Sequence, residues 1–359
     1  MQAPSGRDAP DRCPGAVQVH AAADGGLARV RLPGGRITGA QLRALRTAAA
    51  ELGDPALELT SRGNVQVRAL RPGAELELAA RLAEAGLLPS AAHERVRNIV
   101  ASPLSATVRP LVAEFDALLC ATPALAGLPG RFLATIDDGR GDVTSLLGDV
   151  GLHASRLMLA GVPTELRGGP PLLVRAAEAF LAERAAQGSN AWRLAELSDG
   201  PARVAARLGT TLGTFRPFSS GAPEPGIHGD LAVLVVPLGL LTSGQSAALA
   251  ALEEIIVTPW RTVVVPAAAM ADAVESGLAA DPASPWAGVT ACAGRPGCAK
   301  SRADVRADAR AAVAAGTAEP AHWVGCERRC GAPKGRHVEM LATGTDACGG
   351  TVYRRSVTG

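Results

Sequence analysis

The chain has 359 residues, of which 47% are hydrophobic and 19% are charged, and its formal net charge is +2 at pH 7. This length is enough for about two or three domains with their own cores. So small a net charge provides no overall attraction to nucleic acid or to a membrane surface. Lysine occurs only at positions 300 and 334, so 34 of the 36 basic residues are arginine. This bias is typical of a GC-rich genome, and it also suits a protein that binds a polycarboxylate, because guanidinium groups pair with carboxylates bidentately.

The N-terminal residues contain Pro, Gly, Asp and Arg without an apolar run, so no signal peptide is predicted. The longest apolar run, 231–241, is too short to cross a bilayer. We therefore expect a cytoplasmic protein. Seven cysteines, an odd number, in a reducing compartment favour metal-bound or buried thiols over disulfides.

The first part of the chain predicts alternating strands and helices. Residues 1–16 are expected to form a loose arm that contains Cys13, and residues 27–32 alternate as a strand before a turn at 33–35. Thr38 is predicted to cap a helix that Gly53 ends. Further predicted elements are strands at 57–59 and 65–70, a turn at 61–64 and a helix at 74–85.

Residues 230–266 look like a second copy of this unit. Thr242 takes the place of Thr38 as the cap, and Gln245 follows it at the spacing of Gln41. Thr258-Pro259-Trp260-Arg261 likewise echoes Thr60-Ser61-Arg62-Gly63. The repeat indicates a pseudo-two-fold domain with one cleft. The alternative is a chance likeness between two Ala-rich amphipathic units.

The middle and the end of the chain contain fewer clear signals. The predicted elements are a loop at 97–103, a helix at 110–120, a strand at 133–136, a helix at 171–186, a Pro/Gly/Ser-rich linker at 216–229 and strands at 338–341 and 351–354.

Four cysteines near the C-terminus form the strongest candidate site. Cys292 and Cys298 are separated by five residues, and Cys326 and Cys330 by three. Four thiolates on two glycine-containing loops match the ligands of a [4Fe–4S] cluster. A helix predicted at 300–315 places Cys298 at or just before its start, where the helix dipole favours an anionic cluster. Structural zinc is the alternative, although its cysteine pairs are usually two to four residues apart. Disulfides are a second alternative, which a reducing compartment disfavours. Cys13 and Cys120 are predicted to be packed thiols.

Several stretches resemble one enzyme superfamily. Residues 60–66 (Thr-Ser-Arg-Gly-Asn-Val-Gln), 97–99 (Arg-Asn-Ile), 128–132 (Leu-Pro-Gly-Arg-Phe) and the Cys-x5-Cys…Cys-x3-Cys pattern occur in this order in nitrite and sulfite reductases of the sirohaem/[4Fe–4S] type. Within that superfamily, residues 13–15, 24–35 and 241–261 are most similar to the precorrin-3B synthases, the monooxygenases of aerobic cobalamin biosynthesis.

The resemblance implies an α+β fold in which two ferredoxin-like half-domains are related by a pseudo-two-fold and adjoin α/β cluster-bearing domains. The implied division is an N-terminal arm at 1–16, a first half-domain at 17–92, a first α/β domain at 93–215, a linker at 216–229, a second half-domain at 230–285 and a [4Fe–4S]-binding domain at 286–359.

The resemblance also implies a reaction, namely the hydroxylation of precorrin-3A by O2 with closure of a γ-lactone and with electrons passing through the cluster. The tetrapyrrole carboxylates are expected to contact Arg62, Arg97 and Arg131, with Asn64 and Gln66 as weaker polar contacts. Since no Gly-x-Gly-x-x-Gly follows a strand, NADH is expected to reduce a separate electron donor. A mononuclear non-haem iron is also implied. The six histidines show no 2-His-1-carboxylate spacing, so the sequence names neither its ligands nor a catalytic residue.

One position departs from the reductase pattern, because Leu133 stands where the reductases carry a second basic residue after the phenylalanine. Loss of this cation disfavours sirohaem bound in the reductase manner. In the reductases, the cysteine that matches Cys330 also bridges the cluster to the haem iron. A sirohaem-dependent sulfite or nitrite reductase remains an alternative, as does a non-catalytic iron–sulfur or tetrapyrrole-binding protein.

Overall fold

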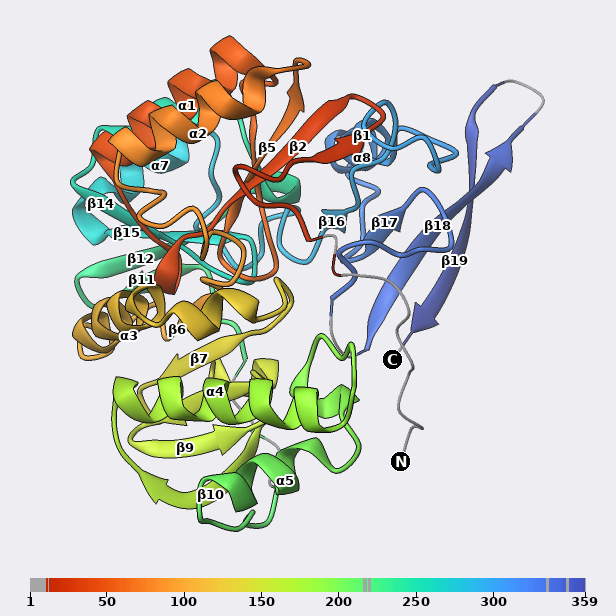
Figure 1. The fold of residues 1–359 in the computed structure, drawn as a ribbon. Coiled ribbons are helices and arrows are strands. Elements are labelled where there is room, and N and C mark those ends of the chain that lie inside the picture. The colour runs from red at the N-terminus through yellow and green to blue at the C-terminus, as the bar shows by residue number, and fades with distance from the viewer. Residues whose placement is uncertain are drawn as a thin grey trace.

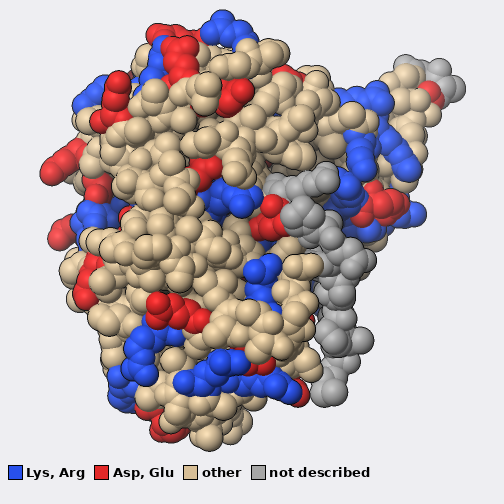
Figure 2. All heavy atoms as spheres, in the orientation of Figure 1, with Lys and Arg blue, Asp and Glu red and all other residues tan. Residues whose placement is uncertain are grey.

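The computed structural model describes residues 11, 13–215, 218, 221–333, 336–346 and 349–358, and these form three five-stranded sheets and one four-stranded sheet (Figure 1). No helix among these residues combines the length and the apolarity that a membrane crossing requires. On the face that Figure 2 shows, acidic and basic side chains are interspersed, as the small net charge suggests.

The first two sheets are antiparallel and exchange a strand. The first has the order β1 (His20–Ala22), β2 (Gly25–Val30), β5 (Val65–Leu70), β4 (Leu57–Leu59), β13 (Leu240–Leu241). The second has the order β11 (Gly226–His228), β12 (Leu231–Val235), β15 (Thr262–Pro266), β14 (Glu254–Val257), β3 (Arg36–Thr38). Each sheet therefore takes its last strand from the other half of the chain, which locks the two half-domains together.

The helices of the two half-domains confirm the internal repeat. The first copy contains α1 (Gly39–Leu52) and α2 (Ala74–Glu84), and the second contains α6 (Ser243–Ala250) and α7 (Met270–Glu275). Thr38 and Gln41 form a capping box at the start of α1, and Thr242 and Gln245 form the same box at the start of α6. In both copies the glutamine amide also donates to a backbone carbonyl just beyond the second helix. One apolar core is shared by both copies.

The third sheet has the order β10 (Val162–Arg167), β9 (Arg156–Leu159), β8 (Val150–His153), β7 (Ala134–Asp137), β6 (Ile99–Ala101). Strands β6, β7 and β8 are parallel, and the remaining pairs are antiparallel. The accompanying helices are α3 (Arg109–Ala121), α4 (Pro170–Ala186) and α5 (Gly200–Arg207). Phe132 and Phe180 are fully buried with ring centroids 5.0 Å apart, so the segment around Phe132 is fixed against α4.

The last sheet contains β16 (Thr290–Ala291), β17 (His322–Val324), β18 (His337–Thr345) and β19 (Thr351–Thr358), with α8 (Val305–Ala314) packed beside it. Strands β16, β17 and β18 are parallel, and the β18–β19 hairpin extends away from the rest of the molecule (Figure 1). Short 3-10 helices occur at Pro33–Gly35, Pro123–Gly127, Thr144–Leu146, Leu194–Glu196, Pro237–Gly239 and Ala267–Ala269.

Three local predictions were wrong. The loop expected at 97–103 contains the strand β6, which pairs with β7 in the buried sheet. The helix expected at 300–315 begins only at Val305, because the Asp304 carboxylate accepts a hydrogen bond from Ala307 N at 3.0 Å and caps the helix there. Cys298 therefore does not lie at a helix N-terminus, and the dipole argument for it fails. The linker expected at 216–229 contains a strand, since β11 pairs with β12.

Candidate functional site

The loops that carry the four cysteines leave the same edge of the last sheet. Cys292 follows β16 directly, and Cys326 lies two residues beyond β17, the parallel neighbour of β16. Burial raises the pKa of the Cys292 thiol, and the nearby Cys326 and Cys298 raise it further. The pKa of Cys330 is raised by burial and then by the other three thiols. The structure thus gathers both pairs into one group, which we call the cysteine group.

The spacing of the cysteine group is wider than a single ion requires. Tetrahedral zinc with Zn–S bonds of about 2.3 Å places its sulfurs about 3.8 Å apart. Among the described residues, no three of these sulfurs lie within 4.8 Å of one another. The sulfurs therefore do not lie as close together as a single zinc ion would hold them.

Glycines let the two cysteine loops close on each other. A Cβ on Gly325 would overlap Ser301 Oγ, and one on Gly331 would lie 2.6 Å from the Arg261 guanidinium. Gly325 N also donates to Cys292 Sγ at 3.4 Å. A backbone N–H directed at a sulfur is a common feature of iron–sulfur sites, because it stabilises the thiolate. The residues present therefore fit a [4Fe–4S] cluster.

One face of the first sheet carries polar side chains beside the cysteine group. Arg29 pairs with Gln66 across β2 and β5, and Glu58 pairs with Gln66 across β4 and β5. Gln66 and Arg68 are two residues apart on β5, so they share this face at a separation of about 7 Å. Gln66 Oε1 accepts from Arg29 Nε at 3.0 Å, whereas Arg68 Nη2 donates at 2.7 Å to the backbone carbonyl that precedes Cys298. The strand β5 thus supports both the cysteine loop and the arginines described next.

Arg29, Arg31 and Arg62, here called the arginine group, gather around Cys13. Cys13 Sγ accepts from Arg29 Nη1 at 3.3 Å and from Arg31 Nη2 at 3.5 Å. Burial, followed by repulsion from Arg29, lowers the pKa of Arg31 to about 10. Burial, followed by repulsion from Arg193, lowers the pKa of Arg62 to about 10. Desolvated cations this close together provide a site for a polyanion.

Two members of the arginine group have no carboxylate partner among the residues that the structure describes. Arg31 is 2% exposed, yet its buried Nη1 has no hydrogen-bond partner within the described part of the chain. Arg62 Nη1 donates only a long bond, 3.4 Å, to Gly130 O, and no described carboxylate lies within ion-pair distance of it. Since a desolvated cation is normally paired, the buried Arg31 and the half-buried Arg62 indicate a carboxylate ligand.

The other residues predicted to contact the substrate have different surroundings. Asn64 is 1% exposed, and its side chain accepts from Leu32 N at 2.9 Å and donates to Asn98 Oδ1 at 3.2 Å, so it holds the loops together. Gln66 orients Arg29, as described above. Arg131 is exposed, and its guanidinium lies over the Trp192 ring at 5.1 Å from the centroid.

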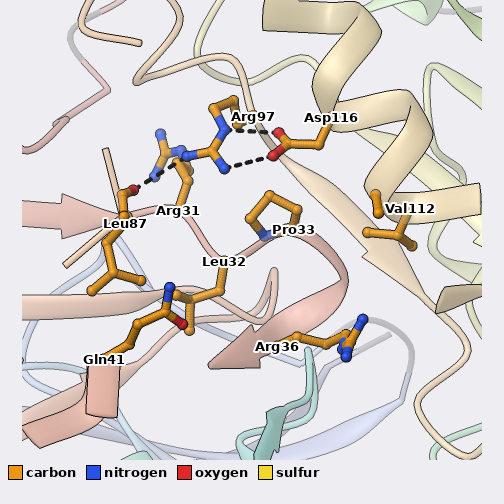
Figure 3. A pocket seen from close by; sticks show the side chains of 11 residues that line it. Arg31, Leu32, Pro33, Arg36, Gln41, Leu87, Arg97, Val112 and Asp116 are labelled. Atoms are coloured by element: carbon orange, nitrogen blue, oxygen red, sulfur yellow. Dashed lines mark hydrogen bonds and ion pairs between the residues drawn. The ribbon is translucent and has the colours of Figure 1, made fainter. Parts of the chain in front are cut away.

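Arg97 already has an internal carboxylate. Its Nε and Nη2 donate to both oxygens of Asp116 at 2.7 Å, and its Nη1 donates to Leu87 O at 3.2 Å (Figure 3). The side chain lines a cavity of about 150 Å³ together with Arg31. The role predicted for Arg97 stays a prediction, and a ligand carboxylate must share this guanidinium with Asp116.

Sequence reasoning missed Arg29, Arg31 and the position of Cys13 between them. Arg29 and Arg31 flank Val30, so they lie on the same face of an extended strand. The alternation of Arg29 and Arg31 with the apolar Val30 and Leu32 was the sequence signal that could have indicated a cationic strand face.

Leu133 lies in an apolar wall. It is 4% exposed and packs with Val100 and Val143, and Trp260 covers them. Trp260 occupies the position in the second copy that Arg62 occupies in the first, so the two equivalent turns contribute different chemistry.

Comparisons with known proteins agree with this fold. The family model described as "Nitrite/Sulfite reductase ferredoxin-like half domain" matches residues 20–85. A solved structure described as "Structure of Mycobacterium tuberculosis NirA protein" is similar with a TM-score of 0.70 and 20% sequence identity, covering 92% of this chain and 74% of that one. No curated protein matches the sequence. The α+β fold with ferredoxin-like half-domains, expected from the sequence, is confirmed.

Proposed function

We propose that this chain is an oxidoreductase of the precorrin-3B synthase type, which hydroxylates precorrin-3A with O2 and closes a γ-lactone. The observation that carries the proposal is the arginine group, and the apolar Leu133–Trp260 cluster supports it. Desolvated arginines that form no ion pair with any described carboxylate suit a tetrapyrrole with many carboxylates. The Leu133–Trp260 wall replaces a cation that the reductase resemblance calls for.

Cys292, Cys298, Cys326 and Cys330 would hold the [4Fe–4S] cluster in this proposal. When bound, the cluster supplies electrons one at a time, and a separate NADH-dependent donor would reduce it. Ligation deprotonates the thiols, so the raised pKa values of Cys292 and Cys330 oppose it until iron compensates for the charge.

The arginine group would bind and orient the substrate. Arg31 and Arg62, which pair with no described carboxylate, would form charge-assisted hydrogen bonds to carboxylates of the substrate. Gln66 keeps Arg29 on the same face of the sheet. The apolar Leu133–Trp260 wall excludes water from its side of the macrocycle, and it offers no cation there to a small anion such as sulfite.

The resemblance also implies a mononuclear non-haem iron, for which the described residues offer no convincing ligands. In the described part of the chain, three metal-ligating atoms lie within 4.8 Å of one another only at Asp137, Asp138 and Asp142. Four backbone N–H groups of its own loop already donate to Asp137. We therefore assign no step to this iron.

A sirohaem-dependent sulfite or nitrite reductase is the second candidate. The family model that matches residues 20–85 favours it, as does the exposure of Cys330, the thiolate that would also reach the haem iron.

The absorption spectrum of anaerobically purified protein, together with turnover, separates these functions. The proposal predicts a broad iron–sulfur shoulder without sirohaem bands, and O2-dependent consumption of precorrin-3A. Sirohaem bands with sulfite or nitrite reduction would establish the second candidate. A cluster without turnover of any of these substrates would indicate a non-catalytic binding protein.

A further inference from the structure

Arg261 occupies a backbone position that its repeat partner gives to glycine. Thr60–Asn64 and Thr258–Thr262 form the same turn with the same hydrogen bonds, in which Gly63 has φ 65° and Arg261 has φ 59°. An arginine is disfavoured in this left-handed conformation, because its Cβ approaches the following carbonyl oxygen. A residue in a strained backbone conformation persists only where the surrounding structure holds it there, and residues of this kind are common at functional sites.

Two glycines make room for the Arg261 side chain. A Cβ on Gly239 would overlap the Arg261 methylenes, and one on Gly331 would lie 2.6 Å from Arg261 Nη2. The same Nη2 donates to Gly331 O at 3.0 Å. Gly331 directly follows Cys330, so Arg261 of the second half-domain holds the last cysteine loop.

A histidine holds the same loop from another side. His322 is fully buried, its Nε2 donates to Cys330 O at 3.2 Å, and its Nδ1 accepts from Thr290 Oγ1 at 2.9 Å. The carbonyls of Cys330 and Gly331 are thus bound by two different side chains, which restricts where the Cys330 sulfur can lie.

Arg261 also belongs to a charge network that reaches both cysteine pairs. Glu58 lies 3.0 Å from Arg306 and 3.9 Å from Arg68, and it attracts Arg261 electrostatically. Arg68 donates to Gly297 O, which precedes Cys298, and Arg261 donates to the carbonyl that follows Cys330. The half-buried Glu58 therefore attracts both arginines that anchor the two loops, although the close ion-pair partner of Arg68 is Asp24 at 3.0 Å.

We propose that Arg261 is a positioning residue for the iron–sulfur cluster: it fixes the Cys330 loop and places a half-buried cation near the cluster. A nearby cation stabilises the reduced, more negative cluster and so raises its reduction potential. This inference rests on the proposed function only in requiring that the cysteine group hold a cluster. It requires neither precorrin turnover nor sirohaem.

The test measures the midpoint potential and the EPR signal of the reduced cluster in full-length, anaerobically purified protein. Arg261→Gln removes the charge, and Arg261→Lys keeps the charge but lacks the planar guanidinium. Arg261→Gly removes the charge and also the strain, because glycine adopts this left-handed conformation freely. Arg207→Gln is the control, because it removes an arginine that pairs with Glu183 on the α4–α5 side, at the bottom of Figure 1 and away from the cysteine loops.

We expect the Gln and Gly variants to shift the potential to more negative values and to alter the EPR g-values. The Lys variant should have a midpoint potential close to that of the wild type but an altered EPR signal. The control should match the wild type in both measurements. Since the Gly variant adopts the turn of the first copy, it keeps the test valid if the Gln variant fails to fold. Wild-type potential and EPR signal in both variants would overturn the role of Arg261 and leave the proposed function standing. A wild-type protein without iron and sulfide would overturn both.

Discussion

Replacing Arg62 by alanine should weaken tetrapyrrole binding without destabilising the protein. Burial and repulsion from Arg193 lower the pKa of Arg62 to about 10. A shift of this size corresponds to roughly 3 kcal/mol against the charged, folded state, and partial exposure reduces it to roughly 1–2 kcal/mol. The long hydrogen bond to Gly130 O contributes about 0.5–1 kcal/mol in the other direction. We therefore expect the unfolding free energy of the ligand-free protein to change by about 1 kcal/mol or less, with a bias toward stabilisation.

Binding should change much more than stability. A hydrogen bond between a guanidinium and a carboxylate contributes about 1.5–3 kcal/mol, which corresponds to a loss of affinity of roughly 10- to 150-fold. Titration with uroporphyrin, a stable tetrapyrrole polycarboxylate, followed by absorbance, measures the affinity. Urea denaturation measures the unfolding free energy, and iron and sulfide content should stay at the wild-type level.

Arg97→Ala is the matched control, because Arg97 has the internal partner that Arg62 lacks. Breaking its two 2.7 Å bonds to Asp116 leaves an unpaired carboxylate and should cost about 3–5 kcal/mol of unfolding free energy. If Arg62→Ala instead destabilises the protein as much as Arg97→Ala and leaves uroporphyrin affinity unchanged, Arg62 is structural and the arginine group is not the ligand site.

Three further predictions concern the cysteine group, the apolar wall and the charge network. Cys326→Ser should bleach the iron–sulfur absorption, and full iron and sulfide content in that variant would exclude it as a ligand. Leu133→Lys should lower the free energy of unfolding, measured by urea denaturation, by about 3 kcal/mol or more, because it buries an unpaired ammonium beside Trp260. An unchanged denaturation midpoint would mean that the wall is open to solvent. Burial alone raises the pKa of Glu58, but Arg306 and Arg68 outweigh it and hold the pKa below 4.5. Its contribution to stability is therefore present above pH 4.5 and is lost as the pH falls through the pKa of the folded state. Glu58→Gln should therefore destabilise the protein by about 3 kcal/mol near neutral pH, and the variant should lose less stability than the wild type when the pH is lowered. A Gln variant with wild-type stability at every pH would contradict this.

Local sequence signals predicted much of the fold. The strand at 57–59 and the strand at 65–70 have the predicted bounds, and the helix after Thr38 ends at Leu52 as expected. These elements depend on capping and alternation within a few residues. Strands β8, β9, β10 and β14 were not predicted, because short strands defined by their neighbours in a sheet have weak signals of their own. The exchange of β3 and β13 between sheets is a tertiary feature that no local pattern encodes.

The site was predictable only where ligands are close in sequence. The two cysteine pairs could be found from their spacing. Whether an arginine is available to a ligand depends on partners that sequence does not reveal. Arg97 and Arg62 looked equivalent, yet Asp116, on a helix nineteen positions away, pairs with one of them and no described carboxylate pairs with the other. Cys13 belonged to a segment expected to be a loose arm, and only the fold places it beside Arg29 and Arg31.

The most direct test of the account is the iron and acid-labile sulfide content of anaerobically purified protein, with EPR after reduction. The account predicts about four irons and four sulfides per chain and the signal of a reduced [4Fe–4S] cluster, both lost when Cys292, Cys298, Cys326 or Cys330 is replaced by serine. One zinc per chain, or a cluster that survives these replacements, would contradict it.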